Sequence, residues 1–258
     1  MDQNRFLQNR FILSELVKKG IRLKYRRSYL GIVWSLLEPL LTTAVLTIVF
    51  GTLFANKDPK FPVYILSGRL IYSFFSQGTT SALKSIRANS SLIKKVYVPK
   101  LLYPLSCILF NYIIFLISLI VMGLLCVIFK VTPTWHIVEA LIPLFNLLLI
   151  TTGCGLILST VGVFFRDMEY LWTVLLMLVM YASAIFYKPE RLLNSGYGFI
   201  LKLNPLYCVI SDFRQCVIYG KSPYFHVYSL YAFIFGVVSI AVGLWAFKKN
   251  EDKFILNI

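Results

Sequence analysis

The feature that most constrains this chain is a series of apolar runs, each about as long as a bilayer is thick. A transmembrane helix needs about 20 predominantly apolar residues to cross a hydrocarbon core of about 30 Å. Runs of that length recur along the chain, and short polar segments separate them. The composition agrees, because 58% of the residues are hydrophobic and only 14% are charged. We therefore expect an all-α membrane protein with one membrane domain.

The first stretch of the chain predicts a different kind of helix. An apolar stripe recurs there at the spacing of one helix face, with charged residues opposite, and consists of Leu13, Leu16, Val17, Gly20 and Ile21. This pattern favours an amphipathic interface helix over residues 1–30, lying on the cytoplasmic face of a membrane. The transmembrane domain is then 31–258, with six transmembrane helices at about 32–54, 62–83, 101–129, 137–165, 170–187 and 225–247 and an inner loop at 84–100.

Residues 188–224 are too apolar for a solvated loop, although glycine and proline interrupt them. Broken backbone at membrane depth is tolerated only where it is buried in protein or lines a water-filled cavity. We therefore expect two short re-entrant helices between spans 5 and 6, on the outer side, with a hinge at Asn204–Pro205. A cap packed on the outer surface of the bundle is the alternative.

The charge pattern indicates where the protein resides. The formal net charge is +15, but the basic residues lie between apolar runs instead of along one groove. This favours anionic membrane lipids, and not nucleic acid, as their partner. With the N-terminus inside, cytoplasmic segments carry Lys and Arg in an excess of roughly two to one over the outer segments. The bias predicts a multi-pass protein of the cytoplasmic (inner) membrane with both termini cytoplasmic.

Ionisable residues within the spans are few, and each is costly to bury in lipid. Such residues should face the bundle or reach an interface, and Glu38, about one turn from the cytoplasmic end of its span, is close enough to extend to the interface. Arg69 and Glu139 both fall in the outer half, where Arg69 either pairs with Glu139 or points to water. A proton-coupled carrier would need an acidic relay near the midplane, and the sequence shows none.

The sequence offers little support for catalysis. It has no GxxxxGK[ST] phosphate-binding loop, no GxSxG and no HExxH, and its five cysteines lack a metal-binding spacing. We expect neither a metal site nor ATP hydrolysis by this chain. Asp167 and Glu169 could serve a membrane glycan-modifying enzyme, but Arg166 beside Asp167 is more easily explained by a local ion pair or a docking contact.

Four groups of motifs, in order along nearly the whole chain, resemble those of the polysaccharide-export permeases of ABC transporters, the type-2 exporter class. They are YLGIVW at 29–34 with EPL at 38–40, NSSLIKKVYVP at 89–99, FFRD at 164–167, and AIFY at 184–187 with LNPL at 203–206 and Gly220. The chain departs from the family pattern in three places. Ser183-Ala184 replaces the usual Ser-Pro, Lys188 precedes Pro189, and Arg69 stands where an apolar residue is common.

The resemblance implies a homodimer joined to two copies of a separate ATP-binding subunit, which uses the ATP and Mg²⁺. This chain itself would bind no cofactor. The implied cargo is a polysaccharide linked to polyprenyl pyrophosphate, such as O-antigen, teichoic acid or a related cell-surface glycan, moved from the cytoplasm to the outside. An ABC exporter of a drug or lipid is the nearest alternative.

The resemblance and the charge pattern together suggest roles for four groups of residues. Binding of the anionic substrate headgroup at the inner mouth is expected of Arg22, Lys24, Arg26, Arg27, Lys94 and Lys95. Coupling to the ATP-binding subunit is expected of Lys18, Lys19, Arg87, Arg166 and Asp167. The predicted outer gate consists of Phe186, Tyr187, Asn204 and Pro205. Because flat rings can stack on sugars, the candidates for lining the channel are Tyr29, Trp34 and Tyr181.

Overall fold

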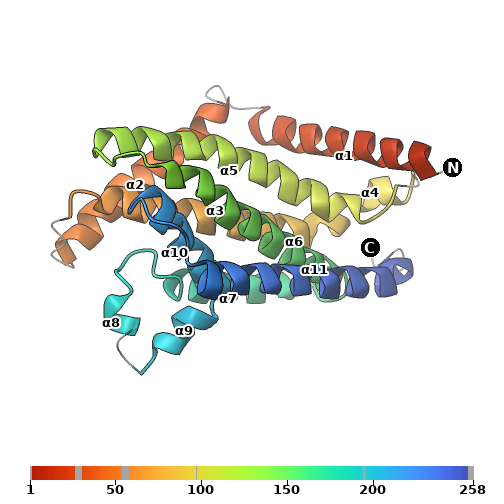
Figure 1. Cartoon of the computed structure of the whole chain (residues 1–258). Helices are drawn as coiled ribbons and strands as arrows, with labels where there is room; N and C mark the ends of the chain where they lie inside the picture. The colour runs from red at the N-terminus through yellow and green to blue at the C-terminus, as the bar shows by residue number, and fades with distance from the viewer. Residues whose placement is uncertain (1, 27–30, 54–57, 97, 194–195, 255–258) are drawn as a thin grey trace.

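The computed structural model describes residues 2–26, 31–53, 58–96, 98–193 and 196–254, and every regular element in these ranges is a helix (Figure 1). The longer helices are α1 (Asp2–Tyr25), α2 (Trp34–Leu53), α3 (Phe61–Ala88), α5 (Leu102–Ile128), α6 (Leu141–Phe164), α7 (Met168–Tyr181), α10 (Pro205–Val217) and α11 (Leu230–Asn250). The short elements are η1 (Gly31–Val33), α4 (Ser90–Ile93), η2 (Trp135–Ala140), α8 (Glu190–Leu193), α9 (Gly198–Leu203), η3 (Phe225–Ser229) and η4 (Glu251–Lys253).

Four of the described helices are long and apolar enough to cross a membrane. They are α2, α5, the continuous helix formed by η2 and α6, and the helix around α11 that runs over Val227–Lys253. α3 is longer, at 28 residues, but it is too polar to meet the same criterion. α7 is apolar but has only 14 residues, about 21 Å at 1.5 Å per residue. Crossing of the membrane by α3 and α7 therefore stays a prediction.

α3 carries its polar residues because other helices surround it. It packs against α2, α5 and α6, and most of its side chains are buried. The buried hydroxyls of Ser67, Thr79 and Ser85 each donate to a carbonyl three or four residues earlier in the same helix. Since those hydrogen bonds are made within α3, the hydroxyls can be buried without an unsatisfied donor. α3 is thus the central helix of the bundle.

α6 and α11 run side by side in the same direction and approach each other closely at glycines. A Cβ on Gly153 of α6 would lie 2.1 Å from Oγ of Ser239 and 2.6 Å from the backbone nitrogen of Ile240. A Cβ on Gly243 of α11 would lie 2.8 Å from Cβ of Leu156. Small residues of this kind bring helix backbones together in membranes, where lipid gives helices no hydrophobic reason to associate.

α1 runs alongside the first half of α5, with its N-terminus at the same end of the bundle as α4 and the C-terminus of the described chain (Figure 1). The predicted apolar stripe faces this neighbour. Val17 is buried, and Gly20 lies against the ring of Phe110, while Lys18 and Lys19 on the other side are exposed. The amphipathic pattern is therefore present, but its apolar face covers protein. The position of α1 on a membrane surface stays a prediction.

The segment after α7 differs from the expectation in two respects. The helix expected over 170–187 ends at Tyr181, and Ala182–Tyr187 forms a non-helical linker in which Ala184 has φ +48°. Three helices, α8, α9 and α10, follow instead of two. The predicted break is at Asn204, whose side chain accepts a hydrogen bond from the Leu206 nitrogen and caps α10. Re-entry of these helices into a bilayer stays a prediction.

A second, smaller apolar core, the α4-end cluster, lies apart from the main core. Its buried members are Ile86, Tyr103, Val163, Phe247 and Phe254, and its partly buried members are Leu16, Leu92, Ile93, Val98, Leu101 and Phe164. Because these residues come from α1, α3, α4, α5, α6, α11 and the segments that follow them, the cluster joins the helix ends on one side of the bundle.

Candidate functional site

A pocket of about 450 Å³ lies between the last turn of α1, the first half of α2, α3 and α5. Its volume falls within the range of about 300–1,000 Å³ that is usual for small-molecule sites. The lining combines charged, amide and aromatic side chains, among them Lys24, Tyr25, Trp34, Glu38, Gln77 and Asn111. The pocket is therefore the first place to look for contact with a polar ligand.

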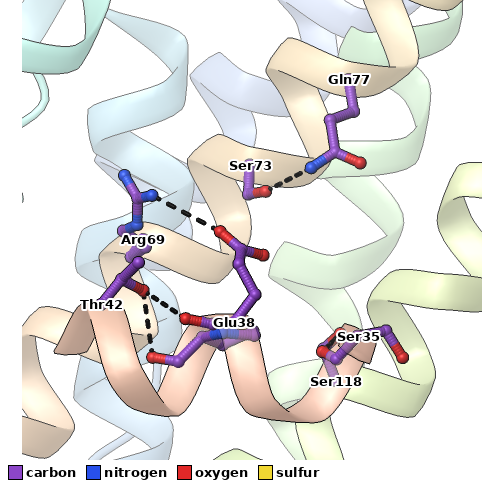
Figure 2. A network of polar contacts seen from close by, with 8 residues as sticks. Ser35, Glu38, Thr42, Arg69, Ser73, Gln77 and Ser118 are labelled. Carbon is purple, nitrogen blue, oxygen red and sulfur yellow. Dashed lines mark hydrogen bonds and ion pairs between the residues drawn. The ribbon is translucent and has the colours of Figure 1, made fainter. Parts of the chain in front are cut away.

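Polar contacts connect α2 and α3 beside this pocket, and Figure 2 shows Glu38 of α2 turned toward Arg69 of α3. Oε1 of Glu38 lies 3.6 Å from Nη2 of Arg69. Further along α3, Nε2 of Gln77 donates to Oγ of Ser73 at 2.9 Å. Nζ of Lys24 donates to Oε1 of Gln77 at 3.4 Å, so the end of α1 is tied to α3.

One of the two alternatives for Arg69 is wrong. Arg69 does not pair with Glu139, whose Oε2 lies 3.1 Å from Nδ1 of His136 in its own short helix η2. Glu38 turns to Arg69 of the neighbouring helix, and its position relative to the membrane interface stays a prediction. The pairing follows from the packing of α2 against α3, because a charged pair between neighbouring helices is less costly than two separate charges.

Lys24 is the basic residue of α1 that enters this pocket. Burial lowers the pKa of Lys24, and the nearby carboxylate of Glu38 acts in the opposite direction. The ammonium also lies 5.8 Å from the centre of the Phe110 ring. An anionic ligand in the pocket would thus meet a cation whose side chain is exposed, so water partly screens the charge–charge contact.

At the end of the bundle opposite the α4-end cluster, Arg214 of α10 holds the Ala182–Tyr187 linker. Arg214 is only 3% exposed, and its guanidinium donates to the carbonyls of Tyr64, Ala184 and Ile185 and to Oγ of Ser67, at 3.0–3.2 Å. It also stacks on the Tyr64 ring at 3.4 Å, and among the described residues no carboxylate contacts it. The guanidinium therefore uses backbone carbonyls in place of a counter-ion.

The four residues predicted to form the outer gate gather around this linker. Phe186 is buried and stacks on Phe50 of α2, with ring centroids 4.8 Å apart. The hydroxyl of Tyr187 donates to the carbonyl of Tyr181 at 2.9 Å. Nδ2 of Asn204 donates to the Ala182 carbonyl at 3.1 Å, and Pro205 begins α10. The structure thus brings these residues together, while their role as a gate stays a prediction.

Polar contacts fix α7 to α3 along its whole length. At the α4 end, Glu169 bridges Arg87 and Lys84, with 3.1 Å between Oε2 of Glu169 and Nζ of Lys84. Two side-chain hydrogen bonds of 3.0 Å follow, from Nε1 of Trp172 to Oγ1 of Thr79 and from the hydroxyl of Tyr72 to the Leu176 carbonyl. Beyond Tyr181, the Tyr64 hydroxyl donates to the Tyr187 carbonyl at 2.9 Å. α3, α7 and the linker are therefore one connected unit.

The residues predicted to contact an ATP-binding subunit surround the α4-end cluster. Lys18 and Lys19 follow Leu16 on α1, Arg87 follows Ile86, and Arg166 and Asp167 follow Phe164. Lys18, Lys19, Arg166 and Asp167 are exposed. Of the two alternatives for Arg166 and Asp167, the described residues show no ion pair between them, and the docking contact stays a prediction; the acidic partner of Arg87 and Lys84 is Glu169. Glu169 is therefore the carboxylate that joins this end of α7 to α3.

Loss of this carboxylate should have a measurable but limited effect. We expect Glu169→Gln to lower the free energy of unfolding by about 1 kcal/mol, because the bridge is partly exposed and water screens it. Thermal unfolding in detergent checks this value, and high salt should shrink the difference from the unsubstituted chain. Asp167→Asn is the matched control, because Asp167 is exposed and should change stability by less than about 0.5 kcal/mol. Equal effects of the two changes would contradict the assignment.

The predicted headgroup residues do not form one site. Lys24 lines the pocket, whereas Arg22 and Arg26 are exposed elsewhere on the end of α1. Lys94 and Lys95 are exposed beside α4, whose apolar residues pack with Leu16, about two turns of α1 away from Lys24. Of the channel candidates, Trp34 lines the pocket and Tyr181 is exposed next to Phe186. Arg27 and Tyr29 lie outside the described residues.

Three residues whose contacts or burial matter in the structure were not among the predicted site residues. Arg214 lies in the last turn of α10 beside Gln215, where a basic residue usually interacts with the helix C-terminus and water, so its burial had no signal in the sequence. Glu169 could have been distinguished from Asp167 by its place in the first turn of α7, two residues beyond the exposed FFRD turn. Tyr25 gave no signal, because its environment depends on how α1 packs.

Comparisons with known proteins found a matching family model and several relatives. Residues 13–218 match the family model described as ABC-2 type transporter. The chain is 30% identical over 256 residues to an O-antigen export system permease of Myxococcus xanthus, covering 97% of this chain and 96% of the relative. It is 28% identical over 245 residues to such a permease of Klebsiella pneumoniae, covering 94% and 93%. It is 24% identical over 267 residues to a polysialic acid transport protein of Escherichia coli, covering 100% of both chains.

Proposed function

Because the chain belongs to the ABC-2 type transporter family, we propose that it is the membrane permease of an exporter of cell-surface polysaccharide. The observation that carries this proposal is similarity over nearly the full length to permeases named for O-antigen export and to a polysialic acid transport protein. The match covers 93% or more of each of these relatives. The transport role also agrees with the helices that are long and apolar enough to cross a membrane.

Energy for transport is proposed to come from ATP bound and hydrolysed by a separate subunit, with Mg²⁺ held there. The absence of a GxxxxGK[ST] sequence from this chain supports that division of labour. The exposed residues around the α4-end cluster offer a contact surface for such a subunit, because they come from several helix ends that one apolar core joins. Two copies of this chain with two ATP-binding subunits form the proposed assembly.

The proposed cargo is a glycan linked to polyprenyl pyrophosphate, such as O-antigen, teichoic acid or a related polymer. Lys24 supports an anionic headgroup, because it is a cation at a pocket that also carries polar and aromatic side chains. The proposed topology has six spans, both termini in the cytoplasm and re-entrant helices around α9 and α10. The α4 end would then face the cytoplasm and the Ala182–Tyr187 linker would face the outside.

Depletion of this chain in its native cell, followed by extraction of lipid-linked glycan, tests the proposed function. We expect glycan on its polyprenyl carrier to accumulate on the cytoplasmic side while glycan disappears from the cell surface. Re-expression of the chain should reverse both changes. An unchanged glycan profile would overturn the polysaccharide proposal and would favour export of a drug or free lipid by the same family.

A further inference from the structure

The pocket at the end of α1 contains a hydroxyl without a partner. The hydroxyl of Tyr25 is buried and makes no hydrogen bond in the described structure. A buried polar group without a hydrogen bond destabilises a fold, so it usually has a structural partner or a functional reason. Because Tyr25 lines the pocket, a ligand hydroxyl or oxygen bound there could supply the missing bond.

The other polar groups of the pocket are also available to a ligand. The carboxylate of Glu38 lies 3.6 Å from Arg69, beyond hydrogen-bond distance, so its oxygens keep their acceptor capacity. The amide of Gln77 donates to Ser73 and accepts only a long contact from Lys24. Carboxylate and amide groups suit vicinal hydroxyls, because each hydroxyl both donates and accepts a hydrogen bond.

The aromatic side chains of the lining suit the C–H face of a sugar ring. The indole of Trp34 is half-exposed at the pocket, and Phe74 and Phe115 also line it. A sugar ring presents a C–H face that packs on such rings and a rim of hydroxyls that meets acids and amides. The volume of about 450 Å³ suits one sugar residue and its attachment better than an extended polymer.

We propose that this pocket binds a single sugar residue of the exported glycan, the one next to the lipid carrier. The inference rests on the proposed export of lipid-linked glycan and deepens it. Tyr25, Glu38 and Gln77 meet the sugar hydroxyls, and Trp34 packs on the ring. We place the bound sugar next to the lipid carrier because the Lys24 ammonium lines the same pocket and can bind the phosphate that adjoins that sugar.

Equilibrium binding to the transporter in lipid nanodiscs tests this site with two probes. One is the lipid-linked glycan extracted from depleted cells, and the other is polyprenyl pyrophosphate without glycan. Tyr25→Phe and Gln77→Ala are each expected to weaken binding of the glycan-bearing lipid about tenfold, the factor for one lost hydrogen bond. Tyr25→Phe should not change binding of the glycan-free lipid, whereas Lys24→Gln should weaken binding of both.

Tyr25→Phe has a second expected effect that separates ligand recognition from damage to the fold. Because the change removes a buried hydroxyl without a partner, it should raise the Tm of the ligand-free protein. Tyr103→Phe is the matched control, since the Tyr103 hydroxyl is also buried and unpaired but belongs to the α4-end cluster. It should raise the Tm in the same way and leave the affinity for both lipids unchanged.

Three results would overturn the sugar site. Unchanged affinity of the Tyr25 and Gln77 variants for the glycan-bearing lipid would show that the pocket is not a ligand site. An equal loss for both lipids would assign it to the pyrophosphate alone. In either case the proposed export function stands, because the unsubstituted transporter still binds its cargo. If the unsubstituted transporter does not bind the glycan-bearing lipid at all, the proposed function itself fails.

Discussion

In an Arg214→Gln variant, α10 and the Ala182–Tyr187 linker are expected to loosen from α3. The substitution leaves the Ile185 carbonyl buried without the donor that now reaches it, while the Ala184 carbonyl loses one donor and keeps the Tyr64 hydroxyl at 3.3 Å. With roughly 1–3 kcal/mol for the stranded acceptor and about 1 kcal/mol for the other lost hydrogen bond, the loss of unfolding free energy is on the order of 2–4 kcal/mol. The effect should be large because the guanidinium occupies space that Gly68 leaves open, where a Cβ would lie 2.7 Å from its Nη2.

Two buried thiols of α10 can report this loosening. Cys208 and Cys216 are fully buried, so a maleimide should label them slowly in the intact fold. In a background without the other three cysteines, Arg214→Gln should speed labelling by about tenfold for each 1.4 kcal/mol of easier opening. Arg214→Lys should be intermediate, because one ammonium cannot reach all four acceptors. Lys221→Gln, at an exposed position, is the control, and equal labelling of all these variants would contradict the role of Arg214.

A single methyl group at Gly153 is expected to separate α6 from α11. Its Cβ would lie 2.6 Å from the Ile240 nitrogen and 2.7 Å from the Ser239 backbone carbon, so backbone atoms must move. Overpacking of this kind typically costs about 1–3 kcal/mol, which exceeds the gain of about 0.5–1 kcal/mol from replacing glycine by alanine in a helix. Gly153→Ala should therefore destabilise the protein, against what helix propensity alone predicts.

Gly123 of α5 provides a control with the opposite sign. Nothing lies within 4 Å of a Cβ placed there, so Gly123→Ala should gain helix propensity without a clash. Thermal unfolding in detergent should give a lower Tm for Gly153→Ala and a slightly higher Tm for Gly123→Ala. A Gly153→Ala protein as stable as the unsubstituted chain would show that α6 and α11 adjust freely to one another.

Much of the helical architecture could be predicted from apolar runs, and the exceptions have physical causes. The run over 170–187 is apolar throughout, so nothing in its periodicity shows that the helix stops at Tyr181. The stop depends on donors from elsewhere in the chain, Arg214 and Tyr64, which satisfy the linker carbonyls. α3 was expected as a span from its apolar residues, while its polar residues reflect its central position among other helices.

The candidate sites were predictable only where neighbours in sequence are neighbours in space. The break at Asn204 and its proximity to the linker agree with a local motif, since asparagine before proline is a helix-start signal. Arg69 pairs with Glu38 and not with Glu139 because of which helices pack together, and the spacing of charges along one chain does not determine this packing. The burial of the Tyr25 hydroxyl depends on the packing of α1 beside α5, which the sequence does not show.

The contacts that join α7 to α3 have a consequence for the order of events in transport. Hydrogen bonds and ion pairs between helices are hard to exchange one at a time where water is scarce, so α3, α7 and the linker should move together. A displacement at the Glu169 end then arrives at Tyr187 in the same step. A polymer longer than the membrane is thick occupies both mouths of its conduit at once. A transporter whose two mouths open in concert can pass such a chain, whereas one that always keeps one side shut cannot.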